Sequence, residues 1–126
     1  MQSVPVIFVV EDDADFREVL LEYLSSLGYE VRVFGSAEQL LLFLRHNGSP
    51  APGLVVSDIH LVRATGFDLT RELREASPKL PVILITSFGN PEMEETAIQQ
   101  GASAYLEKPF QLSAMGDLVR QFLPEA

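Results

Sequence analysis

The sequence predicts a doubly wound α/β domain, in which a five-stranded parallel sheet is covered by helices on both faces. Strand and helix patterns alternate five times along the 126 residues, and short segments with Gly, Pro, Asn or Ser connect them. Three of the strand patterns, 6–10, 54–57 and 81–86, are nearly continuous apolar runs, as expected for strands buried on both faces. The length is that of one domain, so we expect residues 1–126 to fold as a single unit.

The first part of the chain shows strand patterns and helical patterns in turn. The apolar run 6–10 is typical of a buried strand, and from Ala14 apolar residues recur at helical spacing until Gly28, which is placed to end a helix. Residues 29–34 read as a strand with alternating polar side chains. Ser36 opens a capping-box-like pattern, which predicts the start of the second helix.

The middle of the chain repeats this alternation. The Asn47-Gly48 pair and nearby prolines end the second helix, and the third strand then runs into Asp58. The third helix is expected over about 67–76, because Ser77-Pro78 closes it. The fourth strand follows over 81–86.

The last part adds two helices and one strand. Asn90 is placed as an N-cap and Pro91 as the first helical residue, which together predict the start of the fourth helix. Gly101 ends that helix, a short strand follows over 104–107, and an apolar stripe predicts a final helix over 112–122.

The composition of the strands also indicates their order. The second and fifth strands alternate apolar and polar residues, as edge strands do, whereas the other three are almost wholly apolar. Edges at two and five fit the order 2-1-3-4-5 of the flavodoxin-like fold. In that order the first and third strands flank the point where ligands bind, at the carboxyl ends of the strands.

The composition restricts the classes of function. With 9 Lys+Arg against 18 Asp+Glu the net charge is -9, which argues against direct nucleic-acid binding by this domain. The absence of cysteine excludes disulfides and thiolate metal sites. No apolar run is long enough to span a bilayer and no signal segment is recognisable, so we expect no membrane association and a cytoplasmic protein.

Polar side chains follow four of the strands. The acids 11–13 follow the first strand, Asp58 ends the third, Thr86 ends the fourth and Lys108 follows the fifth. One acid suffices to cap a helix, and Asp13 is placed to do so. Clustered carboxylates such as Glu11 and Asp12 beside Asp58 need a cation, and hard oxygen ligands suit Mg²⁺ (or Mn²⁺). Taken alone, the acidic triplet fits a cap as well as a metal site, and Asp58 favours the metal.

Asp58 is the candidate nucleophile. A carboxylate beside Mg²⁺ can attack phosphorus to give an aspartyl phosphate. Thr86 is placed to hydrogen-bond a phosphoryl oxygen and Lys108 to pair with another. Neither residue type is diagnostic singly, but the chain has only two lysines, and the Lys108-Pro109 bond is a candidate cis peptide.

These residues carry a family resemblance. The chain resembles, along nearly its whole length, the receiver (CheY-like) domain of bacterial two-component response regulators. The segments that carry the resemblance are Glu11-Asp12-Asp13, Ser57-Asp58-Ile59, Gly66-Phe67-Asp68-Leu69, Ile85-Thr86-Ser87 and Gly101 to Phe110. It implies that Asp58 accepts a phosphoryl group from a sensor histidine kinase or phosphotransfer protein. The implied metal ligands are Glu11, Asp12, Asp58 and the main-chain carbonyl of His60.

The resemblance also implies how the signal is passed on. Thr86 and Tyr105 are the implied switch residues and Lys108 the phosphate partner, so phosphorylation would change the face formed by the fourth helix, fifth strand and fifth helix. Such a domain is a phosphoacceptor that assists its own phosphorylation and dephosphorylation, not a classical enzyme. Residues 88–91 and 105–110 are similar to the FixJ/NarL-like branch, whose members often carry a DNA-binding helix-turn-helix output domain. A homodimer through the same face is plausible for the family.

The loop after Asp58 departs from the family pattern. Val62 stands where members of the family commonly have a proline. Thr65, just before Gly66, stands where they often have an acid. Loss of the proline should make the loop less rigid. His60 and Phe88 flank the site, and we hypothesise that they control water access and thus the lifetime of an aspartyl phosphate; an ordinary loop histidine is the simpler interpretation of His60.

Two other classes of function compete with a phosphorylated receiver. A degenerate receiver would act as a phosphorylation-independent interaction module, as the altered loop allows. An enzyme of similar fold would need a Ser/Thr/Gly-rich or glycine-rich phosphate loop after the first strand, and acids stand there instead. A metal-dependent phosphohydrolase usually has an acid two residues after its nucleophile, where this chain has His60.

Overall fold

The computed structural model describes residues 4–46, 48–61, 65–87 and 89–124. Its centre is a parallel sheet in the order β2-β1-β3-β4-β5, which confirms the predicted doubly wound, flavodoxin-like fold. The strands are β1 Val6–Val10, β2 Glu30–Phe34, β3 Leu54–Asp58, β4 Val82–Thr86 and β5 Ala104–Glu107. The helices are α1 Ala14–Ser26, α2 Ala37–His46, α3 Gly66–Ala76, α4 Pro91–Gln99 and α5 Leu112–Phe122.

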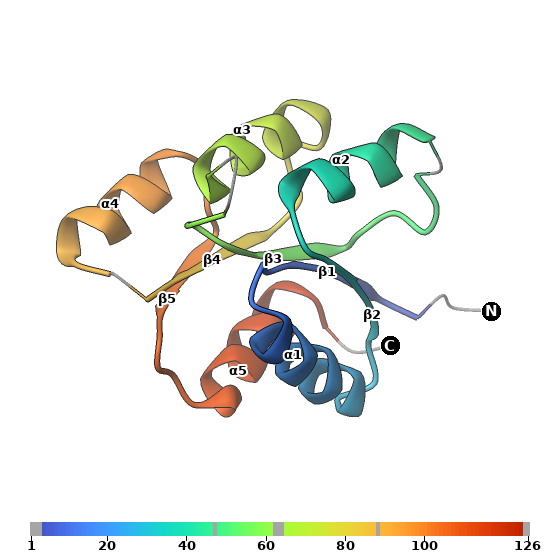
Figure 1. Cartoon of the computed structure of the whole chain (residues 1–126), viewed down its shortest axis with the longest axis horizontal. Helices are drawn as coiled ribbons and strands as arrows, with labels where there is room; N and C mark the ends of the chain where they lie inside the picture. The colour runs from blue at the N-terminus through green and yellow to red at the C-terminus, as the bar shows by residue number, and fades with distance from the viewer. Residues whose placement is uncertain (1–3, 47, 62–64, 88, 125–126) are drawn as a thin grey trace.

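Helices cover both faces of the sheet. Figure 1 shows α2, α3 and α4 on one face and α1 and α5 on the other. Every residue of β1, β3 and β4 is buried, whereas β2 and β5 are only partly buried, as expected of edge strands. Between α2 and the sheet, the rings of Phe8, Phe34 and Phe43 pack with centroids 5.1 to 5.7 Å apart. In the described part of the chain, no helix has the length and apolarity that crossing a membrane requires.

The strand register brings the polar strand ends to one edge. Val10 pairs with Ser57, Asp58 with Ile85, and Thr86 with Glu107. Because all strands are parallel, the residues that follow β1, β3, β4 and β5 emerge at the same edge of the sheet. The register therefore positions the predicted site.

Local sequence signals set the ends of the helices that lead from this edge. The Asp13 side chain accepts hydrogen bonds from the N–H groups of Asp15 and Phe16 and caps α1, as predicted. Asn90 caps α4 in the same way, with Pro91 at the first helical position. The N-cap of each helix thus lies beside the carboxyl end of a strand, where it satisfies backbone donors that the helix leaves unpaired.

The structure refines two of the predicted helix starts. The third helix begins at Gly66 rather than Phe67, because Thr65 and Asp68 form a capping box, with N–O distances of 3.1 and 3.2 Å. At the second helix, Ser36 accepts from the Gln39 N–H, but the Gln39 side chain accepts from Gly35 rather than from Ser36. The pattern there is half of a capping box.

Candidate functional site

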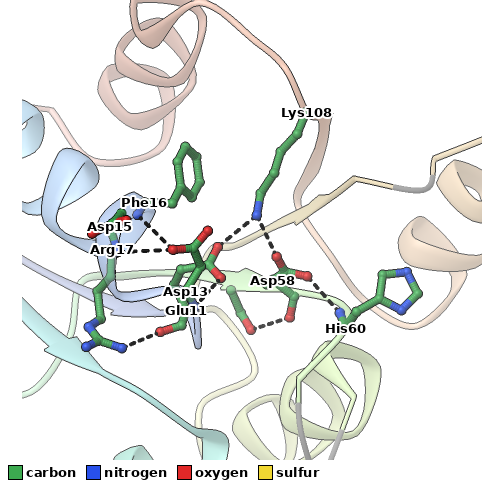
Figure 2. Close-up of polar contacts among 9 residues, drawn as sticks. Glu11, Asp13, Asp15, Phe16, Arg17, Asp58, His60 and Lys108 are labelled. Carbon is green, nitrogen blue, oxygen red and sulfur yellow. Dashed lines mark hydrogen bonds and ion pairs between the residues drawn. The ribbon is translucent and has the colours of Figure 1, made fainter.

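The Asp58 carboxylate lies at the end of β3, with only 7% of its side chain exposed. Its Oδ1 accepts a hydrogen bond of 2.8 Å from the His60 backbone N–H, so the loop that follows β3 orients the carboxylate (Figure 2). The Ser57 hydroxyl donates to the Asp58 carbonyl at 2.9 Å. These contacts fix both the backbone and one oxygen of Asp58 and leave Oδ2 directed at Lys108.

Lys108 joins the two most buried carboxylates of the site. Its Nζ lies 2.8 Å from Asp58 Oδ2 and 2.9 Å from Glu11 Oε1 (Figure 2). The same ammonium lies 4.4 Å from the centroid of the Phe16 ring, a cation–π distance. The Lys108-Pro109 bond is cis, as the sequence suggested. The structure thus brings together three of the predicted site residues, from three separate strand ends.

Burial and the contacts between charged groups shift the pKa values of Glu11 and Lys108. The Glu11 side chain is only 1% exposed, and burial raises the pKa of its carboxyl to about 7. The charge of Asp58 adds to the rise, while Lys108 and the Asp13 N–H oppose it. Burial also disfavours the charged Lys108, but hydrogen bonds to Asp58 and Glu11 outweigh it and raise the pKa of the ammonium. Lys108 therefore stays charged at neutral pH.

The donor set fits a hard cation. Carboxylate oxygens of Glu11 and Asp58 and the nearby backbone carbonyls are the ligands that Mg²⁺ prefers. Each carboxylate oxygen has about two lone-pair directions, so the contacts with Lys108 and with backbone N–H groups leave acceptor capacity. Asp12 is exposed, and within the described residues no three His, Asp or Glu side chains converge closely enough to bind a metal ion. The metal-binding role of Asp12 and of the His60 carbonyl stays a prediction.

The two predicted switch residues lie on β4 and β5. Thr86 is fully buried at the end of β4, and its carbonyl accepts a hydrogen bond from the Lys108 N–H at 2.7 Å. Tyr105 is partly exposed on the neighbouring strand and packs against the core beneath α4. This backbone hydrogen bond therefore ties Lys108, the predicted phosphate partner, to β4, the strand that pairs with the one carrying Tyr105.

The loop residues that we predicted to tune dephosphorylation are only partly described. The exposed His60 ring extends away from the Asp58 carboxylate (Figure 2), and its backbone pairs with Thr65 in a short antiparallel bridge. Phe88 and Val62 lie outside the described residues. The proposed control of water access stays a prediction.

Three site residues were missed from the sequence. Phe16 belongs to the apolar residues that recur from Ala14 to Gly28, and this pattern does not indicate that its ring faces Lys108 and contacts Phe110 edge-on at a centroid distance of 5.9 Å. Arg17 donates to the Glu11 carbonyl at 2.8 Å, which no local pattern indicated. Gly66 is close to Asp58, because a Cβ there would lie 2.6 Å from the Asp58 carbonyl oxygen. The one sequence signal for this close approach was a glycine in the loop that follows Asp58.

Comparisons with known proteins identify the family of this chain. The family described as the response regulator receiver domain matches residues 7–120. The C4-dicarboxylate transport transcriptional regulatory protein DctD of Rhizobium meliloti is 36% identical over 110 residues, which cover 87% of this chain and 23% of that protein. The transcriptional regulatory protein TdiR of Thauera aromatica is 34% identical over 117 residues, 93% of this chain and 50% of that protein.

Solved structures show the same likeness in three dimensions. The BeF3-activated DrrB receiver domain superposes with a TM-score of 0.86 at 30% identity, covering 96% of this chain and 98% of that one. The receiver domain of NtrX from Brucella abortus has a TM-score of 0.84 at 33% identity, covering 95% and 99%. The sequence is thus similar to response regulators, and the fold is similar to solved receiver domains.

The chain spans half or less of the length of the curated relatives described above. Those relatives do not confirm the FixJ/NarL-like branch, which rested on two short segments. What the comparisons do show is the family over most of the chain. The chain belongs to the response regulator receiver domains of two-component signal transduction, whose members are switches rather than classical enzymes.

Proposed function

We propose that this chain, over residues 1–126, is one receiver domain that accepts a phosphoryl group on Asp58 and passes the signal on through a change of its surface. The observation that carries the proposal is the position of Asp58 Oδ2, at a strand end and 2.8 Å from Lys108 Nζ. A nucleophilic carboxylate needs a cation next to it to hold an incoming phosphoryl group. Lys108 supplies that cation.

The proposed donor is a phosphohistidine of a sensor histidine kinase or phosphotransfer protein. An Asp58 carboxylate oxygen attacks phosphorus, an oxygen–phosphorus bond forms, and the phosphorus–nitrogen bond breaks. The electron pair of that bond leaves with the imidazole of the donor. Lys108 moves from carboxylate to phosphoryl oxygen as the new negative charge develops, and the Thr86 hydroxyl binds a second phosphoryl oxygen.

The metal in this proposal is Mg²⁺ or Mn²⁺, held by Glu11, Asp12, Asp58 and the carbonyl of His60. When bound, it supplies positive charge at the transferred phosphoryl oxygens. Burial disfavours the charged form of Glu11 and raises its pKa to about 7, and a bound cation would offset this cost as Lys108 does.

The proposed output is carried by other chains or domains. Phosphorylation draws Thr86 toward the phosphate, and Tyr105 changes position beside it, which alters the surface of α4, β5 and α5. Two relatives are named as transcriptional regulatory proteins, which supports a DNA-binding output domain outside this chain and a cytoplasmic location. A helix-turn-helix domain of the FixJ/NarL-like branch and a homodimer through this surface are candidates for that output.

The test is the intact mass of the protein after incubation with acetyl phosphate, with and without Mg²⁺. We expect a gain of one phosphoryl group that needs Mg²⁺ and that Asp58→Asn abolishes. Asp117→Asn is the matched control, because Asp117 has an 80% exposed side chain on α5 and should leave phosphorylation unchanged. The same three proteins are then tested with a phosphorylated histidine kinase.

The alternative function is a phosphorylation-independent interaction module. It predicts no mass gain from either donor while the protein is folded. A gain that survives in Asp58→Asn would contradict Asp58 as the acceptor and direct attention to Asp12 or Asp13.

A further inference from the structure

The loop between β4 and α4 passes unusually close to β5 at Gly89. A Cβ added at Gly89 would overlap the Tyr105 hydroxyl oxygen and would lie 2.8 Å from Glu107 Cδ, whereas real Cβ atoms essentially never approach closer than 3.0 Å. The glycines with positive φ are Gly28, Gly48 and Gly101 among the described residues. Gly89 is therefore needed for space and not for its backbone conformation.

The two groups that meet Gly89 come from one face of β5. Tyr105 and Glu107 are two residues apart, so their side chains project from the same side of the strand. Both contacts involve the far ends of side chains rather than backbone. A side chain at residue 89 would therefore displace these two ends and leave the sheet intact.

Tyr105 is held weakly in this position. Its hydroxyl oxygen is buried and has no hydrogen-bond partner among the residues that the structure describes. The Asn90 backbone lowers the pKa of Tyr105, but it does not complete a hydrogen bond to the hydroxyl. A buried hydroxyl without a partner is a net cost, so packing under the loop alone keeps Tyr105 there.

We propose that Gly89 is the steric gate of the Tyr105 switch. The missing side chain at residue 89 lets the Tyr105 ring lie beneath the β4–α4 loop, and any side chain there holds the ring outside. The link to phosphorylation rests on the function proposed above, but the steric gate itself does not.

The gate also controls a surface feature. Tyr105 forms part of the wall of a groove of about 460 Å³ between α4 and β5, together with Ala104 and Ile98. Ile98 is 51% exposed, so the groove presents apolar surface to solvent. Because Tyr105 lines this groove, displacement of its ring by a side chain at residue 89 would change the shape of the groove.

The test uses Gly89→Ala in protein labelled with 3-fluorotyrosine. The chain has 3 tyrosines, so three ¹⁹F resonances are expected, each assigned by a Tyr→Phe variant. In the unphosphorylated protein we expect Gly89→Ala to shift the Tyr105 resonance and to increase its broadening by a soluble paramagnetic agent severalfold, with the other two unchanged. An unchanged Tyr105 resonance in the folded variant would overturn the proposal.

The matched control is Gly116→Ala on α5. There a Cβ would lie 2.5 Å from the Tyr23 hydroxyl, so the same substitution should shift Tyr23 and leave Tyr105 in place. A double-mutant cycle of Gly89→Ala with Tyr105→Ala covers the case in which Gly89→Ala folds poorly. The gate predicts that Gly89→Ala loses more stability in the wild-type background than in the Tyr105→Ala background, where only the Glu107 side chain has to move. Equal losses in both backgrounds would also overturn the proposal.

Phosphorylation separates the two proposals. If wild type gains a phosphoryl group by mass, its Tyr105 resonance should shift on acetyl phosphate with Mg²⁺, and that of Gly89→Ala should not. A response of the same size in Gly89→Ala would overturn the gate. If neither protein gains mass, the proposed function fails, while the resonances of the unphosphorylated proteins still decide the gate.

Discussion

The two halves of the proposed switch differ in how their polar groups are satisfied. At the Asp58 site, both carboxylates have a cation and a backbone N–H within hydrogen-bonding distance. On β5, the Tyr105 hydroxyl is buried and has no hydrogen-bond partner within the described residues. The two regions are neighbours along the chain, since Lys108 directly follows the strand that carries Tyr105.

This difference suggests a division of tasks. A site that performs chemistry needs its groups held in place, and hydrogen bonds and ion pairs to each carboxylate do this. An element that must change position needs two arrangements of similar free energy, and an unsatisfied hydroxyl raises the free energy of one of them. The comparison predicts that substitutions at the site cost stability, whereas removal of the Tyr105 hydroxyl does not.

The largest effect is expected from Lys108→Gln. It leaves the buried Glu11 and Asp58 carboxylates without their shared cation, which should lower the free energy of unfolding by roughly 1–3 kcal/mol. Urea unfolding in EDTA measures this loss. Mg²⁺ should restore part of it, because the ion replaces the missing positive charge.

Lys79→Gln is the control for this variant. Lys79 is exposed and is the only other lysine, so the change in net charge is the same. Equal urea midpoints for the two variants would show that the contacts of Lys108 with Glu11 and Asp58 contribute no stability. The contrast between this site and Tyr105 would then fail.

A smaller effect is expected from two tyrosine substitutions. Tyr29→Phe removes a hydroxyl that donates to the Leu123 carbonyl at 2.7 Å and should cost about 1 kcal/mol. Tyr105→Phe removes a hydroxyl that has no partner among the described residues and should be neutral or slightly stabilising. Urea unfolding of both variants tests the contrast, and a larger loss for Tyr105→Phe would refute it.

The smallest expected effect concerns stability at alkaline pH. Burial raises the pKa of Tyr105 above its ordinary value of 10.0, and the charges of Glu107 and Glu94 raise it further, against the Asn90 N–H. The unfolded chain therefore loses this proton first, so the stability that Tyr105 contributes is complete below pH 10 and falls as the pH rises toward the folded pKa. Thermal unfolding across this range should show a shallower decline in Tyr105→Phe, and identical slopes would contradict the shift.

Local patterns in the sequence predicted most of the fold. Strand and helix periodicities placed all ten elements to within a residue or two, because each period reflects the burial of one face. The acids after β1, Asp58 after β3 and Lys108 after β5 predicted a shared site, because parallel strands bring these ends to one edge. Residue type alone showed that these groups are acids and an amine, while their roles were taken from the family resemblance.

Contacts between distant segments were decided only by the tertiary structure. No sequence pattern showed that Phe16 faces Lys108, that Arg17 binds the Glu11 carbonyl or that Gly89 leaves room for Tyr105. These contacts depend on where the loops after the strands lie against one another, which local periodicity does not encode. The sequence determined which acids and which amine the site contains and the order of the strands that carry them. The tertiary structure decided which groups touch and which hydroxyl lacks a partner, because packing settles distances that spacing along the chain cannot.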